Sequence, residues 1–246
     1  GFRVIRFDNR DAGLSTEMTA PAPTPWQIAR GAIRRRGLKV EYTVPVMAGD
    51  AVGLLDALGL DKVHVAGMSM GGMIAQQIAI DFPERVLSLT SIMSNTGDRR
   101  HGRPKAALLA KLARLQARPP EDAIEGAVHL FSLISGPNFD AEEVRALAKE
   151  SSARHYDAPG TARQTLAILG SPDRTADLRR LDVPALVIHG MVDPLVLPSG
   201  GVATAKAIPG SRLLMFPDMG HDLPRPRWDE MVDAILANTR RGGFSG

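Results

Sequence analysis

The sequence predicts an α/β fold in which a mostly parallel sheet is flanked by helices. Short β-rich runs alternate along the chain with longer segments whose apolar residues recur at helical spacing. A chain of 246 residues with 44% hydrophobic residues is also long enough to build one substantial core. Alternation of this kind favours a parallel sheet, because helices carry the chain back between parallel strands.

The strands are predicted from short apolar runs bounded by turn residues. The run RVIRFD opens the chain, KVHVAG ends at a glycine, and ALVIHG follows Pro184 and also ends at a glycine. VLSLTSIM and SRLLMF complete the set. The predicted strands are residues 3–8, 62–67, 86–93, 185–190 and 211–216.

Helices are predicted between the strands, where apolar residues recur every three to four positions. Residues 48–60, AGDAVGLLDALGL, have this spacing and close with Gly59. A second helix runs from about Met70 to Asp81 and is stopped by Pro83. The last predicted helix covers residues 228–239.

The interval from Thr96 to Asp182 breaks the alternation. It has several helical windows, such as KAALLAKLARLQA and AEEVRALAKESSARHY, and no convincing strand. We expect an α-helical insertion between two strands of one sheet, lying over the strand ends. The predicted organisation is therefore a core in two parts, residues 1–95 and 183–246, with residues 96–182 inserted between them.

The composition excludes several classes of protein. The net charge of +3 is mildly basic, but only 4% of residues are aromatic and the basic clusters lie in Gly/Pro-punctuated connections, so we expect no nucleic-acid partner. Without cysteine there is no disulfide framework, thiol nucleophile or thiolate metal site. No apolar run reaches the roughly 18–20 residues that span a bilayer. We expect a cytoplasmic protein, although a start without methionine leaves open a secretory signal upstream.

The stretch VHVAGMSMGGMIAQQIAI contains the most informative motif. Its residues 67–71, GMSMG, match G-x-S-x-G after a strand and at the start of a helix. This context indicates a sharp turn that holds Ser69 in a strained conformation with Oγ exposed, and glycines beside it relieve clashes with neighbouring elements. The free N–H groups of the new helix would face a developing oxyanion. We therefore predict Ser69 as a nucleophile rather than as a small residue at a tight packing contact.

A serine hydroxyl needs a base, and the chain has six histidines. His221 follows the last strand in the loop FPDMGHDLP, from where it can reach across the strand ends to Ser69. The others lie in strands, which favours core packing, or in the helical insertion, which favours the surface. They are His64 and His189, and His101, His129 and His155. His221 is therefore the predicted base.

The base needs an acid that fixes its tautomer and stabilises the imidazolium. Asp193, in HGMVDPL, directly follows a predicted strand, and it precedes the histidine in the chain order that this architecture uses. Asp98 stays an alternative at the adjacent strand end. Asp218 and Asp222 are too close to His221 in sequence to turn back easily onto the same ring.

Four segments together carry a resemblance to a known family. They are RFDNRDAGLST, GMSMGGMIAQ, LVIHGMVDPL and FPDMGHDLP. With them the chain resembles the α/β-hydrolase superfamily, and specifically its bacterial esterase/lipase-like branch with a helical cap. The likeness covers residues 1 to about 239. It implies the α/β-hydrolase fold, a mostly parallel sheet flanked by helices with an α-helical cap insertion.

The resemblance also implies roles for individual residues. Ser69 would be the nucleophile, Asp193 the acid and His221 the base of a catalytic triad. The backbone N–H of Met70 would be one donor of the oxyanion hole, and residues 96–182 would form the cap. No metal or organic cofactor is implied.

The N-terminus departs from the family pattern. In the family a β-meander, and a strand followed by an oxyanion loop, come before the strand equivalent to RVIRFD, and neither is present here. That loop normally supplies the second oxyanion donor. We therefore expect the chain to lack the family's N-terminal strands.

Four methionines lie within two residues of a triad candidate: Met68, Met70, Met191 and Met219, of which Met68, Met191 and Met219 are the predicted pocket residues. Methionine is flexible and polarizable, so it lines pockets that accept varied apolar shapes, and it also fills cores. Both interpretations remain open. If these methionines line a pocket, it suits short or medium acyl or alkyl groups.

The leading functional hypothesis is a carboxylic-ester hydrolase that acts on a small-molecule ester through an acyl-enzyme. The same triad could instead serve acyl transfer, perhydrolase and haloperoxidase chemistry, or C–C bond hydrolysis, and fold analogy does not choose among them. A third hypothesis is a catalytically silent member of the fold that acts as a binding protein. All three triad candidates are present, which favours an enzyme.

Overall fold

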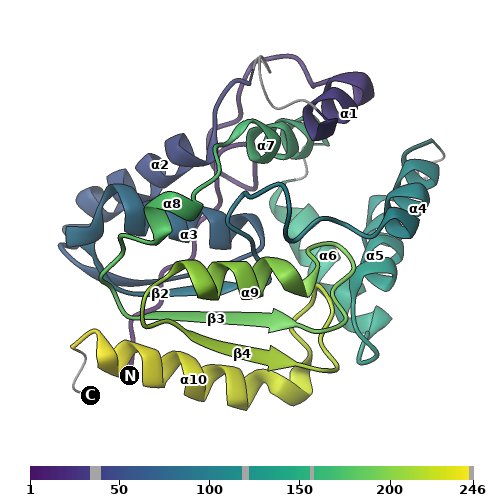
Figure 1. The fold of residues 1–246 in the computed structure, drawn as a ribbon. Coiled ribbons are helices and arrows are strands. Elements are labelled where there is room, and N and C mark those ends of the chain that lie inside the picture. The colour runs from purple at the N-terminus through teal and green to yellow at the C-terminus, as the bar shows by residue number, and fades with distance from the viewer. Residues whose placement is uncertain (34–39, 118–121, 156–157, 244–246) are drawn as a thin grey trace.

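The computed structural model describes residues 1–33, 40–117, 122–155 and 158–243. Its centre is a parallel sheet whose four strands lie in chain order. Their bounds are β1 Val63–Met68, β2 Val86–Ile92, β3 Ala185–Gly190 and β4 Arg212–Phe216. All carboxyl ends therefore meet at one edge of the sheet, which the arrowheads of β3 and β4 mark in Figure 1. The predicted α/β fold with a parallel sheet is confirmed.

Helices cover both faces of the sheet. Figure 1 shows α3 (Met70–Asp81), α8 (Thr175–Leu178) and α9 (Pro198–Ala207) on one side and α10 (Trp228–Arg241) on the other. The bounds of the helices outside the insertion are α1 Pro25–Ile33, α2 Val44–Ala57, α3 Met70–Asp81, α9 Pro198–Ala207 and α10 Trp228–Arg241, with short 3₁₀ turns at Pro83–Arg85 and Arg225–Arg227. Among the described residues, no helix is both long enough and apolar enough to cross a bilayer.

The core forms two apolar clusters, one on each face of the sheet. Val44 and Met47 of α2 pack with Ile78 of α3 in the larger cluster, and Phe216 and Met231 belong to the smaller one beside α10. β3 is buried along its whole length. Continuous burial of this kind is expected of a parallel strand that is covered on both faces.

Helices are the only regular secondary structure between β2 and β3 in the described part of the chain. They are α4 Ala106–Ala117, α5 Ala123–Ile134, α6 Ala141–Arg154, α7 Ala158–Gly170 and α8 Thr175–Leu178. α5 packs against α6, and α7 packs against α1. In Figure 1, α4, α5 and α6 lie beyond the carboxyl ends of β3 and β4, so this part of the insertion stands next to the predicted site.

The prediction that RVIRFD forms a strand is wrong. Residues 3–8 form no strand in the structure, and Val4 is 77% exposed. Val4, Ile5 and Phe7 are residue types that favour an extended chain, but a strand also needs a neighbour for its N–H and C=O groups. Among the described residues the segment joins no ladder, and the sheet begins at β1. Directly before this segment, the Phe2 ring lies edge-on against His64, with the ring centroids 5.7 Å apart.

A buried ion pair fastens the N-terminal segment to the helical insertion. Asp11 accepts two hydrogen bonds from the Arg163 guanidinium of α7, at 2.7 and 2.9 Å, and one from the Tyr42 hydroxyl at 2.6 Å. The side chains of both charged residues are almost completely buried. Burial acts to raise the pKa of Asp11, but the bonds from Arg163, Tyr42 and the Met18 N–H outweigh it, so the pKa lies below its usual value.

Replacing Asp11 with alanine is expected to lower the free energy of unfolding at pH 7 by about 3–5 kcal/mol, because Arg163 would keep a buried charge without its carboxylate. A lowered pKa stabilises the fold above the unfolded value of about 3.9, and this stabilisation is lost as the pH falls through the folded value. Urea denaturation at pH 7 and at about pH 3 should therefore show parent and variant converging in acid. Asp50→Ala, which removes a half-exposed partner of Arg10, should cost less than about 1 kcal/mol. An equally small cost at Asp11 would contradict the prediction.

Candidate active site

Ser69 occupies the sharp turn between β1 and α3. Its backbone has φ 52° and ψ −119°, a region that non-glycine residues rarely adopt. The turn is held by a 2.9 Å hydrogen bond from the Ser69 N–H to the carbonyl of Ile92, at the end of β2. Strain of this kind persists only where the surroundings fix the backbone, and it projects the side chain from the sheet edge.

Two glycines make this turn possible. A Cβ atom on Gly67 would lie 2.1 Å from the carbonyl oxygen of Gly71, and one on Gly72 would lie 2.7 Å from Cβ of Ser94. Both contacts are shorter than real Cβ atoms allow. Gly71 is different, since a Cβ there would meet no described atom within 4 Å. The steric demand expected of the motif therefore falls on Gly67 and Gly72.

The structure brings Ser69, His221 and Asp193 together in one hydrogen-bonded chain. Nε2 of His221 lies 2.9 Å from Oγ of Ser69, and Nδ1 lies 2.8 Å from Oδ2 of Asp193. The three side chains come from the turn after β1, the loop after β4 and the loop after β3. Asp193 is fully buried and His221 is 7% exposed, so little water screens the contact between them.

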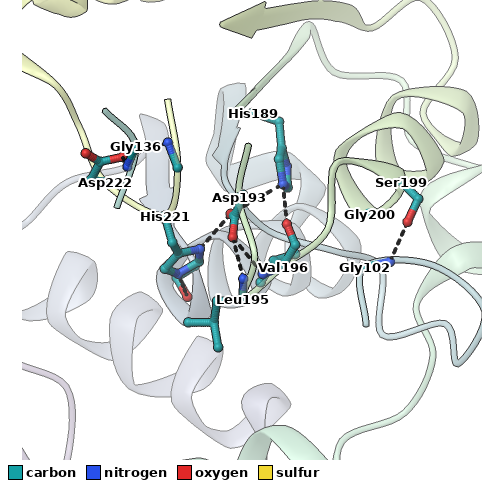
Figure 2. Close-up of polar contacts among 12 residues, drawn as sticks. Gly102, Gly136, His189, Asp193, Leu195, Val196, Ser199, Gly200, His221 and Asp222 are labelled. Carbon is teal, nitrogen blue, oxygen red and sulfur yellow. Dashed lines mark hydrogen bonds and ion pairs between the residues drawn. The ribbon is translucent and has the colours of Figure 1, made fainter. Parts of the chain in front are cut away.

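The two oxygens of Asp193 have separate partners. Oδ1 accepts hydrogen bonds from the N–H groups of Leu195 and Val196, both at 2.8 Å, which leaves Oδ2 directed at His221. Figure 2 shows this arrangement, with the carboxylate between the turn and the imidazole. The carboxylate is therefore held in one orientation before any substrate binds.

His189 lies on the far side of the same carboxylate. It is fully buried, its Nε2–H donates to the Val196 carbonyl at 2.8 Å, and Nε2 is 3.6 Å from Oδ2 of Asp193 (Figure 2). Burial lowers the pKa of His189, which favours its neutral form beside the acid. His189 is a packed core group, as predicted from its strand, but its contact with the loop of Asp193 was not predicted.

The alternative acids contact other groups. Asp98 is paired with His101, and Asp218 with Arg227 at 2.9 Å. Asp222 accepts hydrogen bonds from two backbone N–H groups in its own loop and in the helical insertion. The carboxylate hydrogen-bonded to Nδ1 of His221 is that of Asp193.

The remaining histidines lie away from Ser69. Nδ1 of His64 lies 2.9 Å from the Ser88 hydroxyl on the next strand. Nε2 of His155 is 3.8 Å from a carboxylate oxygen of Glu17. His129 is exposed on α5.

The predicted pocket methionines separate into two groups. Met68 and Met191 are about half exposed, at 47% and 54%, next to Ser69 and on the loop that carries Asp193. Met219 is fully buried in the cluster with Phe216 and Met231. Its side chain therefore belongs to the core and presents no accessible surface to a ligand.

The first turn of α3 faces the serine. Met70 is the first residue of this helix, so its N–H belongs to the turn that has no intrahelical acceptor. Such a group, at the positive end of a helix, can donate to an oxyanion. Among the described residues, no three His, Asp or Glu side chains are grouped as metal ligands would be.

Comparison with known proteins identifies the family of this chain. The model of the α/β hydrolase fold family matches residues 1–224. Rhodomycin D methylesterase of Streptomyces peucetius is 31% identical, over 98% of this chain and 82% of the relative. A putative carbamate hydrolase of Variovorax paradoxus is 29% identical, over 90% and 75%. A hydrolase structure from Pseudomonas aeruginosa superposes with a TM-score of 0.68 at 24% identity, over 97% of this chain and 80% of that one. The chain is a hydrolase that belongs to the α/β-hydrolase family.

Proposed function

We propose that this protein hydrolyses carboxylic esters through an acyl-enzyme on Ser69. The observation that carries the proposal is the hydrogen-bonded chain from Ser69 Oγ through His221 to the buried Asp193 carboxylate. Such a chain supplies a nucleophile, a general base and a group that orients the base, which are the parts that acyl transfer requires.

In the first half of the reaction, Oγ of Ser69 attacks the ester carbonyl while Nε2 of His221 takes the hydroxyl proton. The carbonyl oxygen becomes an oxyanion, which the N–H of Met70 stabilises. Asp193 stabilises the imidazolium that forms and keeps its Nδ1–H in place. His221 then protonates the leaving alcohol as the C–O bond breaks, and Ser69 is left acylated.

In the second half, water replaces the alcohol. His221 takes a proton from this water as it attacks the acyl carbon, and returns it to Oγ of Ser69 when the tetrahedral intermediate collapses. The products are a carboxylic acid and the regenerated enzyme. These steps use the three side chains of the triad, the backbone N–H of Met70 and water.

We further propose a small-molecule methyl or short alkyl ester of an apolar acid as the substrate class. Two features support it. The relative from Streptomyces peucetius is a methylesterase. The half-exposed Met68 and Met191 beside the triad offer flexible apolar surface to an acyl group.

The test combines turnover with covalent labelling. Hydrolysis of p-nitrophenyl butyrate and of methyl butyrate should be detected, and a fluorophosphonate should label Ser69 stoichiometrically with loss of activity. Ser69→Ala should take no label. If the Ser69→Ala variant were still labelled stoichiometrically, Ser69 would not be the nucleophile. Labelling without ester turnover would retain the nucleophile and reject the ester substrate.

A second candidate reaction is carbamate hydrolysis, favoured by the putative carbamate hydrolase from Variovorax paradoxus. The same triad would attack a carbamate carbonyl, and the products would include an amine or ammonia and carbon dioxide. Measuring ammonia release from a simple carbamate beside alcohol release from the methyl ester separates the two. The higher kcat/KM identifies the preferred substrate.

A further inference from the structure

We infer that the loop after α5 of the helical insertion positions the imidazole of His221, and that Asp222 is the positioning residue that joins the two segments. The inference rests on the proposed role of His221 as the base. It assigns to the insertion a direct part in catalytic geometry, in addition to any part in covering the site.

The first contact involves the backbone of His221 itself. Its N–H donates a 2.7 Å hydrogen bond to the carbonyl of Ile134, the last residue of α5. The last carbonyls of a helix have no acceptor role within it, so they need partners from outside. Here the partner is the histidine that faces Ser69, and Ile134 is itself only 4% exposed.

The second contact is made by the carboxylate of Asp222. One oxygen, Oδ1, accepts from the N–H of Gly220 at 2.8 Å and from the N–H of Gly136 at 3.2 Å. Figure 2 shows Asp222 directed at Gly136, while the ring of His221 points toward Asp193. Residues on both sides of His221 are thereby tied to the segment that begins at Ile134.

The two segments also touch backbone to backbone. A Cβ atom on Gly220 would lie 2.4 Å from the nitrogen of Gly136, and a Cβ on Gly136 would lie 2.5 Å from the carbonyl oxygen of Asp218. Only glycine permits this approach on either side. The backbones of the histidine loop and the insertion therefore lie in direct contact at this point.

The consequence concerns the distance between Nε2 of His221 and Oγ of Ser69. Ser69 is fixed by the sheet, through the carbonyl of Ile92, whereas His221 is fixed partly by the insertion. Loss of the link would let the imidazole move relative to the serine. A misplacement of about 1 Å can cost about 10²-fold in rate.

Asp222→Ala tests the inference, with Asp222→Asn as the conservative variant. Oδ1 of asparagine can accept the same two hydrogen bonds, so the link does not need the charge. Steady-state kinetics on p-nitrophenyl butyrate should be divided by the active sites counted with fluorophosphonate. We expect kcat per site to fall about 10²-fold in Asp222→Ala, with KM within about threefold, and Asp222→Asn to restore most of it.

Asp233→Ala is the matched control, because Asp233 is exposed on α10. Thermal melting of each variant separates loss of fold from loss of geometry. A value of kcat per labelled site within twofold of the parent in Asp222→Ala would overturn the inference, and so would equal losses in the alanine and asparagine variants. A parent that neither hydrolyses the ester nor takes the label would overturn the proposed function and this inference together.

Discussion

Replacing Ser69 with alanine is expected to lower kcat for ester hydrolysis by about 10⁶-fold, the scale seen when a triad nucleophile is removed. The variant keeps the imidazole of His221 and the N–H of Met70, so it can still bind and polarise an ester. It has no atom that can form the acyl-enzyme, and only a direct attack by water remains. The measurement is kcat and KM on p-nitrophenyl butyrate at equal, verified concentrations of folded protein.

Ser94→Ala is the matched control for this experiment. Oγ of Ser94 is buried without a hydrogen-bond partner among the described residues, so its removal should change neither kcat nor the fold appreciably. If Ser69→Ala retained more than about a hundredth of parent activity, a group other than Ser69 would be the nucleophile. Equal losses in both serine variants would indicate damage to the fold rather than loss of a reacting group.

The predicted elements that the structure contains depend on local signals. α3 spans Met70–Asp81, the range predicted from apolar spacing and the stop at Pro83. The turn at Ser69 was predictable because it requires residues without a Cβ atom at positions 67 and 72, and the sequence has glycine at both. The spacing of Asp193 and His221 after predicted strands was equally informative, because parallel strands end at one edge of the sheet.

The features that were predicted wrongly or not predicted are those decided by contacts between segments far apart in the sequence. Residues 3–8 have a strand-like pattern, but pairing is decided by a neighbour that no local pattern specifies. The carbonyl of Ile134 and the N–H of His221 are 87 positions apart, and nothing near either residue indicates that they bond. Gly136 and Gly220 were the available signals, because an unexplained glycine often marks close approach of two backbones.

Replacing Asp193 with asparagine is expected to lower kcat by about 10⁴-fold with little change in KM, since this scale follows when the base is held in the wrong tautomer. The hydrogen bonds of the Asp193 loop fix the orientation of the new amide. The N–H groups of Leu195 and Val196 require an acceptor at the Oδ1 position, so the amide NH₂ must replace Oδ2. The amide NH₂ then donates to Nδ1 of His221, and the ring proton must sit on Nε2. A protonated Nε2 cannot accept the proton of Ser69.

Asp98→Asn provides the comparison, because Asp98 is the other acid that the sequence allows at a neighbouring strand end. Its carboxylate pairs with His101 on its own loop, so this variant should keep kcat near that of the parent. A large loss in Asp98→Asn with activity retained in Asp193→Asn would exchange the two roles. Fluorophosphonate labelling sharpens the comparison, because Asp193→Asn keeps the serine and loses only its activation. Its labelling should therefore be slow but still reach completion at Ser69, whereas Ser69→Ala takes none.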